Sequence, residues 1–407
     1  MKMYVILNEA KDNKSDHKKS DVAKSQESEE TKMSEKSKHK LVWPDYKNCI
    51  ANLPNSILKK LGAGPVGDTL PLADKYLEKD YKNIVLLLLD GMGKSILERH
   101  LKEDGAFRSH LAGIYQSVFL STTVAATTSA MSGLQPCEHS WLGWECYYPS
   151  VDKNITVFTN QTQGTEEQAA DYNVPWTVTP YENIIEKIRK TGKDAYLIAP
   201  FTEPELDDIE KICDRIKNLC NQSGQKSIYA YWKQPDGLLH RHGCGSEEVH
   251  EALINMEKVV SELAGELEDT LIFVTADHGH LDNDFVVLQD YPDLCDCLVR
   301  LPSLEPRVLN LFVKEEKKEY FEKEFNNLFG DKFILMPMEE AIEKKLFGTG
   351  TPHKEFRGML GDYLAIATGN LSIFFNEEHW KSMHGSITED EVLIPLIVFQ
   401  SEGRFSD

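Results

Sequence analysis

The chain has 407 residues, of which 41% are hydrophobic and 27% are charged, and this ordinary globular composition excludes a wholly disordered or fibrous protein. The length suits one large α/β domain with an insertion, or two domains. A formal net charge of −21 excludes a surface that coats nucleic acid, because such binding needs clustered Lys and Arg, whereas bound divalent metals would still let an acidic protein hold phosphates.

The N-terminal segment predicts a disordered charged tail over residues 1–41. Residues 11–40 contain no Leu, Ile, Phe, Tyr or Trp, so they cannot bury enough surface to offset the entropy of ordering. The start of the chain has no apolar run of signal-peptide length, and the eight cysteines include no CxxC pair. We therefore expect a cytoplasmic protein with reduced thiols. The longest apolar run of the body, 84–89, is too short to span a bilayer, and no membrane partner is expected.

Short apolar runs alternate with helical patterns in the body, which predicts a parallel sheet covered on both faces. The clearest expected strands are 84–89, 195–199, 227–231 and 271–275, and a helix is expected over 246–267. Beyond these, residues 285–378 show a different order of elements, typical of a smaller α+β insertion. The core is then expected to comprise 42–284 and 379–407, with a final strand at 393–399.

Three of the expected strands lead into segments that carry acidic or imidazole side chains. In open α/β sheets, ligands gather at the carboxyl ends of the strands. Taken alone, the first acid reads more simply as a capping residue in a turn, and an isolated His-Gly near the C-terminus reads as a loop histidine. A carboxylate and an imidazole four residues apart can face one point, as a divalent metal requires. The candidate side chains are Asp90, Asp236, His240, Asp277, His278 and His384.

A segment of small residues, 121–134, predicts a helix that begins near Val124. Such a helix would place Thr123 at its N-terminus, where free N–H groups and the helix dipole favour an anion. The Thr123 hydroxyl could then attack phosphorus. Thr is also a good N-cap residue, and the two roles are compatible.

Five short motifs together resemble the alkaline phosphatase superfamily, and in particular its nucleotide pyrophosphatase/phosphodiesterase branch. They are LLLLDGMG at 86–93, STTVAATTSAMSGLQPCEHS at 121–140, QPDGLLHRHG at 234–243, TADHGH at 275–280 and MHGSITEDEVLIPLIV at 383–398. The resemblance covers about residues 80–400. It implies a three-layer α/β sandwich with a mostly parallel central sheet, plus the smaller α+β insertion.

The resemblance also implies two divalent metal ions, zinc in most of the family, with manganese as the alternative. By position, Asp236, His240 and His384 hold one ion. The other is held by Asp90, Asp277, His278 and the hydroxyl of Thr123. Counted back from Ser132-Gly133, Thr123 rather than Thr122 stands where the family keeps its nucleophile, so the resemblance implies that Thr123 has this role.

The function implied is hydrolysis of phosphodiester or pyrophosphate bonds through a covalent phospho-threonine. A small phosphorylated substrate is expected, with a nucleotide among the candidates, and no nucleic-acid polymer. Family diesterases carry an Asn where spacing places Trp144, which could stack on a flat substrate group or simply pack. Phosphomonoesterase and phosphonate hydrolase activities remain alternatives within the superfamily, and a catalytically idle nucleotide- or partner-binding protein is the alternative outside it. The oligomeric state stays open.

Overall fold

The computed structural model describes residues 39–375 and 380–401, and their largest sheet has six strands in the order β2-β17-β8-β1-β7-β6. Strands β8, β1, β7 and β6 run parallel, whereas β17 is antiparallel to both β8 and β2. Each strand expected from the sequence is present, and its ends lie within two residues of the expected ones. The bounds are β2 (Leu111–Gln116), β17 (Leu393–Ser401), β8 (Thr270–Thr275), β1 (Asn83–Leu89), β7 (Lys226–Trp232) and β6 (Asp194–Ile198).

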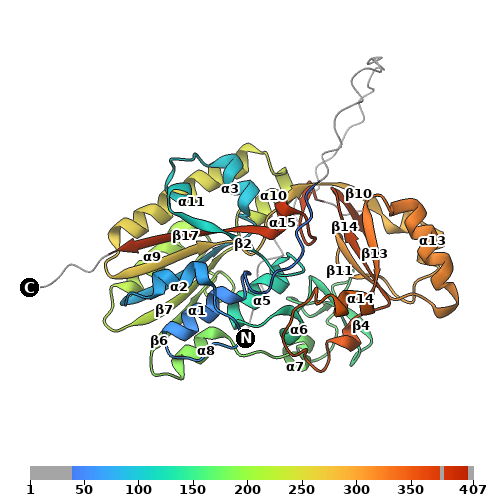
Figure 1. Cartoon of the computed structure of the whole chain (residues 1–407), viewed down its shortest axis with the longest axis horizontal. Helices are drawn as coiled ribbons and strands as arrows, with labels where there is room; N and C mark the ends of the chain where they lie inside the picture. Colours follow the sequence, from blue (N-terminus) through green and yellow to red (C-terminus); the bar gives the residue numbers. More distant parts are fainter. Residues whose placement is uncertain (1–38, 376–379, 402–407) are drawn as a thin grey trace, which may run out of the picture.

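Helices cover both faces of this sheet, so the core has three layers (Figure 1). Every residue of β1, β7 and β8 is buried, which is why these strands are almost wholly apolar rather than alternating. One face carries α3 (Lys94–His100), α4 (Ala106–Ser109), α9 (Ile209–Cys220) and α11 (Glu247–Glu266). The other carries α1 (Asn52–Lys60), α2 (Pro71–Leu77), α5 (Thr123–Ser132) and α8 (Ile184–Arg189).

Helix α11 confirms the expectation for 246–267. The Ser246 side chain accepts a hydrogen bond from the Val249 N–H and so caps the first turn. The buried residues of the helix recur every three or four positions, as a face that rests on a layer below requires. They are Val249, Leu253, Met256, Val260 and Leu263.

A second sheet of seven antiparallel strands forms a smaller domain, in the order β13-β14-β12-β11-β3-β4-β5. Four strands come from the expected insertion: β11 (Ser303–Glu305), β12 (Val308–Leu311), β13 (Phe333–Pro337) and β14 (Tyr363–Ala367). The other three are β3 (Glu145–Tyr148), β4 (Lys153–Thr156) and β5 (Gln161–Thr162), which the sequence placed in the core. Strands of two to four residues are too short to show a periodic pattern, which is why the sequence did not predict β3, β4 and β5. The smaller domain is thus built from two separate pieces of the chain.

Two short strand pairs connect the domains. Strand β10 (Asp284–Val287) runs parallel to β15 (Leu371–Phe374), and β9 (Leu281–Asp282) pairs antiparallel with β16 (Ser382–Met383). The remaining helices are α6 (Pro136–His139), α7 (Val174–Val178), α10 (Asp236–His242), η3 (Leu288–Asp290), α12 (Pro292–Cys295), η4 (Glu315–Lys317), α13 (Lys318–Phe329), α14 (Met338–Glu343), η5 (Arg357–Met359) and α15 (Glu389–Val392). All eight cysteines are free. Within the described residues, no helix combines the length and apolar character needed to cross a membrane.

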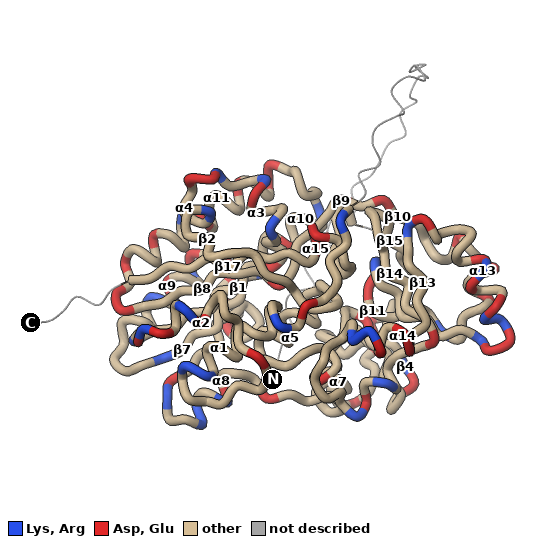
Figure 2. Tube along the Cα trace, viewed as in Figure 1, with Lys and Arg blue, Asp and Glu red and all other residues tan. Residues whose placement is uncertain are grey.

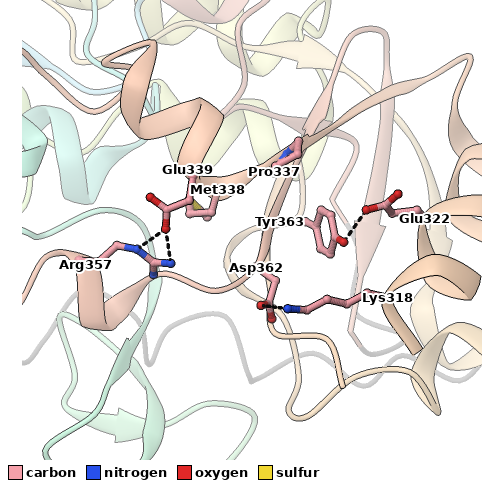
Figure 3. A pocket seen from close by; sticks show the side chains of 8 residues that line it. All are labelled: Lys318, Glu322, Pro337, Met338, Glu339, Arg357, Asp362 and Tyr363. Carbon is pink, nitrogen blue, oxygen red and sulfur yellow. Dashed lines mark hydrogen bonds and ion pairs between the residues drawn. The ribbon is translucent and has the colours of Figure 1, made fainter. Parts of the chain in front are cut away.

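Acidic and basic residues are interspersed along the outer parts of the chain trace, including α13 (Figure 2). A hollow of about 360 Å³ lies in the smaller domain, at the edge of its sheet, and Figure 3 shows the side chains that line it. Its charged groups satisfy one another: Arg357 pairs with Glu339 at 2.6 Å, and Lys318 pairs with Asp362 at 3.0 Å. This hollow therefore offers no excess of positive charge to a phosphate.

Candidate metal centre

The predicted acidic residues meet at one edge of the central sheet. Strands β1, β7 and β8 run in register, with Leu89 opposite Trp232 and Leu88 opposite Thr275, so the loops that follow them start side by side. Gly91 allows the loops to touch: its φ is +77°, and a Cβ there would lie 2.9 Å from Cα of Asp236. The sheet thus brings together groups that are far apart in the chain.

Asp236 is the centre of a first cluster, which we call site A. Its Oδ1 lies 2.8 Å from Nε2 of His280, 3.3 Å from Nε2 of His240 and 3.6 Å from Nε2 of His384. Asp236 and His240 stand one turn apart at the start of α10, as their spacing predicts. One ligand atom from each of these four residues falls in a group whose members all lie within 4.8 Å of one another.

His278 is the centre of a second cluster, site B. Its Nε2 lies 3.1 Å from Oγ1 of Thr123, 3.4 Å from Oδ1 of Asp90 and 3.5 Å from Oδ2 of Asp277. The two sites adjoin, because the His278 and His384 rings stack with centroids 3.7 Å apart. The structure therefore brings together all seven residues that the sequence assigned to the two metals.

Two buried carboxylate oxygens of site B suit a bound cation. Asp90 Oδ1 and Asp277 Oδ2 are buried and have no hydrogen-bond partner within the described residues. The other oxygens are fixed: Tyr231 donates its hydroxyl to Asp90 Oδ2, and the backbone N–H groups of Gly91 and His278 donate to Asp277 Oδ1, both at 3.0 Å. Unpaired buried carboxylate oxygens are costly, and a divalent ion between them removes that cost. The residues present therefore fit a metal.

The histidines are held in the tautomer that a metal needs. The Nδ1 atoms of His240, His278 and His384 lie 2.8, 3.1 and 3.2 Å from the carbonyl oxygens of Ser382, Gly279 and Ser121, respectively. A carbonyl only accepts hydrogen bonds, so the proton is assigned to each Nδ1 from this network. Each Nε2 then presents its lone pair to the centre, the usual arrangement of ligating histidines.

The electrostatics of the centre also favour a bound cation. Burial, and then the neighbouring carboxylate of Asp277, raise the pKa of Asp90 well above its usual range. Burial, and then the neighbouring imidazoles, hold the pKa of His384 well below its usual range, so that ring is neutral at physiological pH. Burial also opposes ionisation of Asp236, but His240 and His280 outweigh it and hold its pKa well below the usual value. Negative charge without enough fixed positive charge is the condition that a metal relieves.

Helix α5 begins at Thr123, one residue before the expected start, and Thr122 is its N-cap residue. The Thr122 side chain is fully buried and does not cap the helix, because its Oγ1 donates to Oε1 of Glu305 at 2.6 Å. Thr123 is half-buried and faces His278. Thr123, rather than Thr122, therefore directs its hydroxyl toward site B.

Glu305, on β11 of the smaller domain, was missed in the sequence. Its Oε1 accepts hydrogen bonds from Thr122 Oγ1 and from the Trp144 backbone N–H at 2.8 Å, and burial raises its pKa to about 7. No motif surrounds it, so only the fold places it here. The Trp144 ring lies edge-on to Phe158, with centroids 5.7 Å apart, in the apolar cluster of the smaller domain.

A hollow of about 610 Å³ lies beside site A, on the side of α10 and β9. The ring of Trp380 on its wall lies 5.4 Å from the His240 ring, centroid to centroid. The hollow combines one cation with polar and aromatic surface. Its lining is His242, Gly243, Gly245, Ser246, Asp282, Asn283, Phe285, Trp380 and Lys381.

Comparisons with known proteins agree with this geometry. The family model of type I phosphodiesterase / nucleotide pyrophosphatase matches residues 84–386. Among solved structures, an inactive variant of murine ectonucleotide pyrophosphatase / phosphodiesterase 5 in complex with AMP has a TM-score of 0.59 and 14% identity, covering 80% of this chain and 88% of that one. The human ectonucleotide pyrophosphatase / phosphodiesterase 5 has a TM-score of 0.60 and 14% identity, with 78% and 87% covered.

Phosphonoacetate hydrolase from Sinorhizobium meliloti 1021, in complex with phosphonoformate, has a TM-score of 0.57 and 15% identity, with 79% of this chain and 91% of that one covered. No curated protein matches the chain. At these identities the solved structures establish the fold alone. They confirm the expected alkaline phosphatase-like α/β architecture.

Proposed function

Because the chain belongs to the type I phosphodiesterase / nucleotide pyrophosphatase family, we propose that it is a two-metal hydrolase of phosphodiester or pyrophosphate bonds, with Thr123 as its nucleophile. The observation that carries this proposal is the position of the Thr123 hydroxyl, which starts helix α5 and lies 3.1 Å from Nε2 of His278. The substrate is a small phosphorylated molecule. Nucleotides are the first class to test, because a solved relative of this fold binds AMP.

Two sets of side chains would hold the ions. Asp236, His240 and His384 supply site A, and Asp90, Asp277, His278 and Thr123 supply site B. Mixed nitrogen and oxygen donors suit zinc, and manganese is the alternative. When bound, the ions supply positive charge that lowers the pKa of the attacking hydroxyl and offsets charge on the phosphoryl oxygens.

In the first step, the Thr123 Oγ1 loses its proton to solvent and forms a bond to phosphorus, while the bond from phosphorus to the leaving oxygen breaks. The leaving oxygen keeps the electron pair and takes a proton from solvent. The first turn of α5 has backbone N–H groups without helical partners, and they can hold the phosphoryl oxygens during this step. In the second step, the oxygen of a water molecule forms a bond to phosphorus and the water loses a proton to solvent. The bond from phosphorus to Thr123 Oγ1 breaks, and Oγ1 keeps the electron pair and takes a proton from solvent, which restores the hydroxyl.

Glu305 favours diesters over monoesters. A phosphomonoester carries nearly two negative charges at neutral pH and a diester carries one. The Glu305 carboxyl is hydrogen-bonded to the residue next to Thr123, and wherever it is ionised it repels the doubly charged monoester more strongly than the diester. Phosphonate hydrolysis is the second candidate, since phosphonoacetate hydrolase shares the fold.

The test compares hydrolysis of bis-p-nitrophenyl phosphate, p-nitrophenyl phenylphosphonate and p-nitrophenyl phosphate by zinc- or manganese-loaded protein. We expect the diester to be the best of the three substrates. Thr123→Ala is expected to lose turnover, whereas Thr123→Ser keeps a hydroxyl and a measurable rate. Full activity of Thr123→Ala, or no hydrolysis of any of the three by the loaded wild type, would refute the proposal. A catalytically idle binding protein would hydrolyse none of the three substrates.

A further inference from the structure

His280 lies inside site A, although the ligand set implied by the family motifs does not include it. It is 2% exposed, and its Nε2 lies 2.8 Å from Oδ1 of Asp236. Its ring centroid is 4.8 Å from those of both His240 and His384. One ring nitrogen of His280 therefore lies within 4.8 Å of a ligand atom from each of Asp236, His240 and His384.

Ser382 fixes the orientation of the His280 ring. The Nδ1 of His280 lies 3.1 Å from Oγ of Ser382, whose own carbonyl accepts from Nδ1 of His240. Ser382 is fully buried and paired with Asp282 between β16 and β9, so both imidazoles are fixed by one rigid residue. A hydroxyl both donates and accepts. Ser382 can therefore support the tautomer in which Nε2 donates to Asp236, and equally the tautomer in which Nε2 offers its lone pair to a metal.

We propose that His280 is a fourth protein ligand of site A and that the centre therefore binds two unlike metal ions. This inference rests on the proposed two-metal function. With His280, site A offers three imidazole nitrogens and one carboxylate, whereas site B offers one imidazole, two carboxylates and the Thr123 hydroxyl. Imidazole-rich sets favour zinc, and oxygen-rich sets accept manganese or magnesium. A catalytic zinc ion usually has three protein donors and can expand to five-coordinate, so a fourth protein donor would hold the ion of site A more firmly than that of site B and still leave a position for a substrate oxygen.

Metal content tests this without recourse to activity. Metal-free wild-type protein is given one equivalent of zinc and an excess of manganese, freed of unbound metal by gel filtration, and analysed by mass spectrometry of the elements. We expect one zinc and one manganese per chain. Cobalt in place of zinc reports the ligand set by its visible absorption, which shifts when an imidazole is removed.

The informative variant is His280→Gln, because its amide can still donate to Asp236 Oδ1 but does not replace an imidazole ligand. We expect zinc binding at one site to weaken by at least ~100-fold, more than the loss of an orienting partner usually causes, and the cobalt spectrum to change. The matched control is His242→Gln, at the end of α10, whose imidazole pairs with Glu248 at 3.3 Å, and it should bind both metals as the wild type does. Thermal unfolding of the metal-free variants checks that they fold.

The outcomes separate the two proposals. Wild-type zinc affinity and an unchanged cobalt spectrum in His280→Gln would overturn the assignment of His280 and leave it as a hydrogen-bond donor to Asp236. Equal zinc affinity at both sites of the wild type would overturn the proposal that the two sites hold unlike ions. Wild-type protein that binds no metal would instead overturn the proposed function. Should His280→Gln fail to fold, Ser382→Ala replaces it, with an expected loss of ~10- to 100-fold in zinc affinity and no loss if His280 is not a ligand.

Discussion

The hydroxyl of Thr123 lies 3.1 Å from Nε2 of His278, although the two residues are 155 positions apart in the chain. Thr123 starts α5 and His278 lies in the loop after β8, so the fold brings these two segments into contact. The half-buried Thr123 faces the cluster of acids, whereas Thr122 points into the smaller domain. The two adjacent threonines therefore have separable roles.

We expect Thr122→Val to reduce stability and leave most of the turnover. The substitution keeps the shape of the side chain but removes the hydrogen bond to Glu305, and the buried carboxyl then loses a donor at a cost of about 1–3 kcal/mol in the free energy of unfolding. Diester turnover should remain within roughly 10-fold of the wild type, since the Thr123 hydroxyl is intact. Urea unfolding and steady-state kinetics measure the two effects. A near-complete loss of turnover with unchanged stability would assign the nucleophile to Thr122.

Asp90→Asn should stabilise the metal-free protein and abolish its stabilisation by metals. In the wild type, Asp90 and Asp277 each leave a buried carboxylate oxygen without a hydrogen-bond partner in the described part of the chain, and their charges repel. The Asn amide can donate to Asp277 while its oxygen still accepts from Tyr231, so the free energy of unfolding of the metal-free form should rise by about 1 kcal/mol or more.

Zinc should stabilise the wild type by about 4 kcal/mol per site when its concentration is ~1,000 times the dissociation constant, and it should stabilise Asp90→Asn less. Thermal unfolding with and without a chelator measures both. Equal stabilisation of the two proteins by zinc would show that Asp90 is not a ligand.

The motifs at the ends of β1, β7 and β8 made most of the centre predictable. Parallel strands in one sheet end at the same edge, so Asp90, Asp236 and Asp277 had to meet once the strands were recognised. His384 follows the short strand β16, which no periodicity marks, and its place came only from the resemblance to the family.

Two residues of the centre could not be predicted in this way. His280 stands in a quoted motif, and the sequence signal was a second imidazole two positions after His278, but spacing alone does not show that its ring turns toward Asp236. Glu305 lies on a strand of three residues that pairs with the adjacent β12 on one side and, on the other, with β3, which is more than 150 residues away. Its position depends on the packing of the smaller domain against the core, which is a long-range property that local patterns do not contain.

Glu305→Gln should change the pH dependence of stability. Burial raises the pKa of Glu305 from 4.5 to about 7, so between these values the folded protein holds a proton that the unfolded chain has lost. The stability contributed by the protonated carboxyl is present below pH 4.5 and is lost as the pH rises toward 7, by roughly 3 kcal/mol at most. The Glu305→Gln variant should not lose stability in this way, because its neutral amide does not titrate and its oxygen still accepts from Thr122 and Trp144. Urea unfolding between pH 5 and 8 measures the free energy of unfolding of both proteins. Plotted against pH, the two free energies should converge toward low pH, and parallel plots would contradict the raised pKa.

A buried ion pair joins the smaller domain to the loop that carries His384. Arg307, between β11 and β12, donates from Nε to Glu391 Oε1 at 2.6 Å and from Nη2 to Oε2 at 3.0 Å, and both side chains are fully buried. Glu391 also accepts from the Ser386 N–H at 2.9 Å and from the Thr388 hydroxyl at 2.6 Å. One carboxylate thus fixes the turn just after His384 to a guanidinium of the other domain.

We expect Glu391→Gln to destabilise the protein by about 3–5 kcal/mol, because the Arg307 charge then stays buried without a counter-ion. The matched control is Glu339→Gln, which removes an arginine partner of the same type from an exposed pair, with Arg357 and Glu339 side chains 53% and 68% exposed, and should cost less than about 1 kcal/mol. Urea unfolding compares the two variants. Metal content adds a second measurement, since release of the turn should weaken metal binding at His384 in Glu391→Gln alone. Similar small losses of stability in both variants would show that the buried pair does not hold the two domains together.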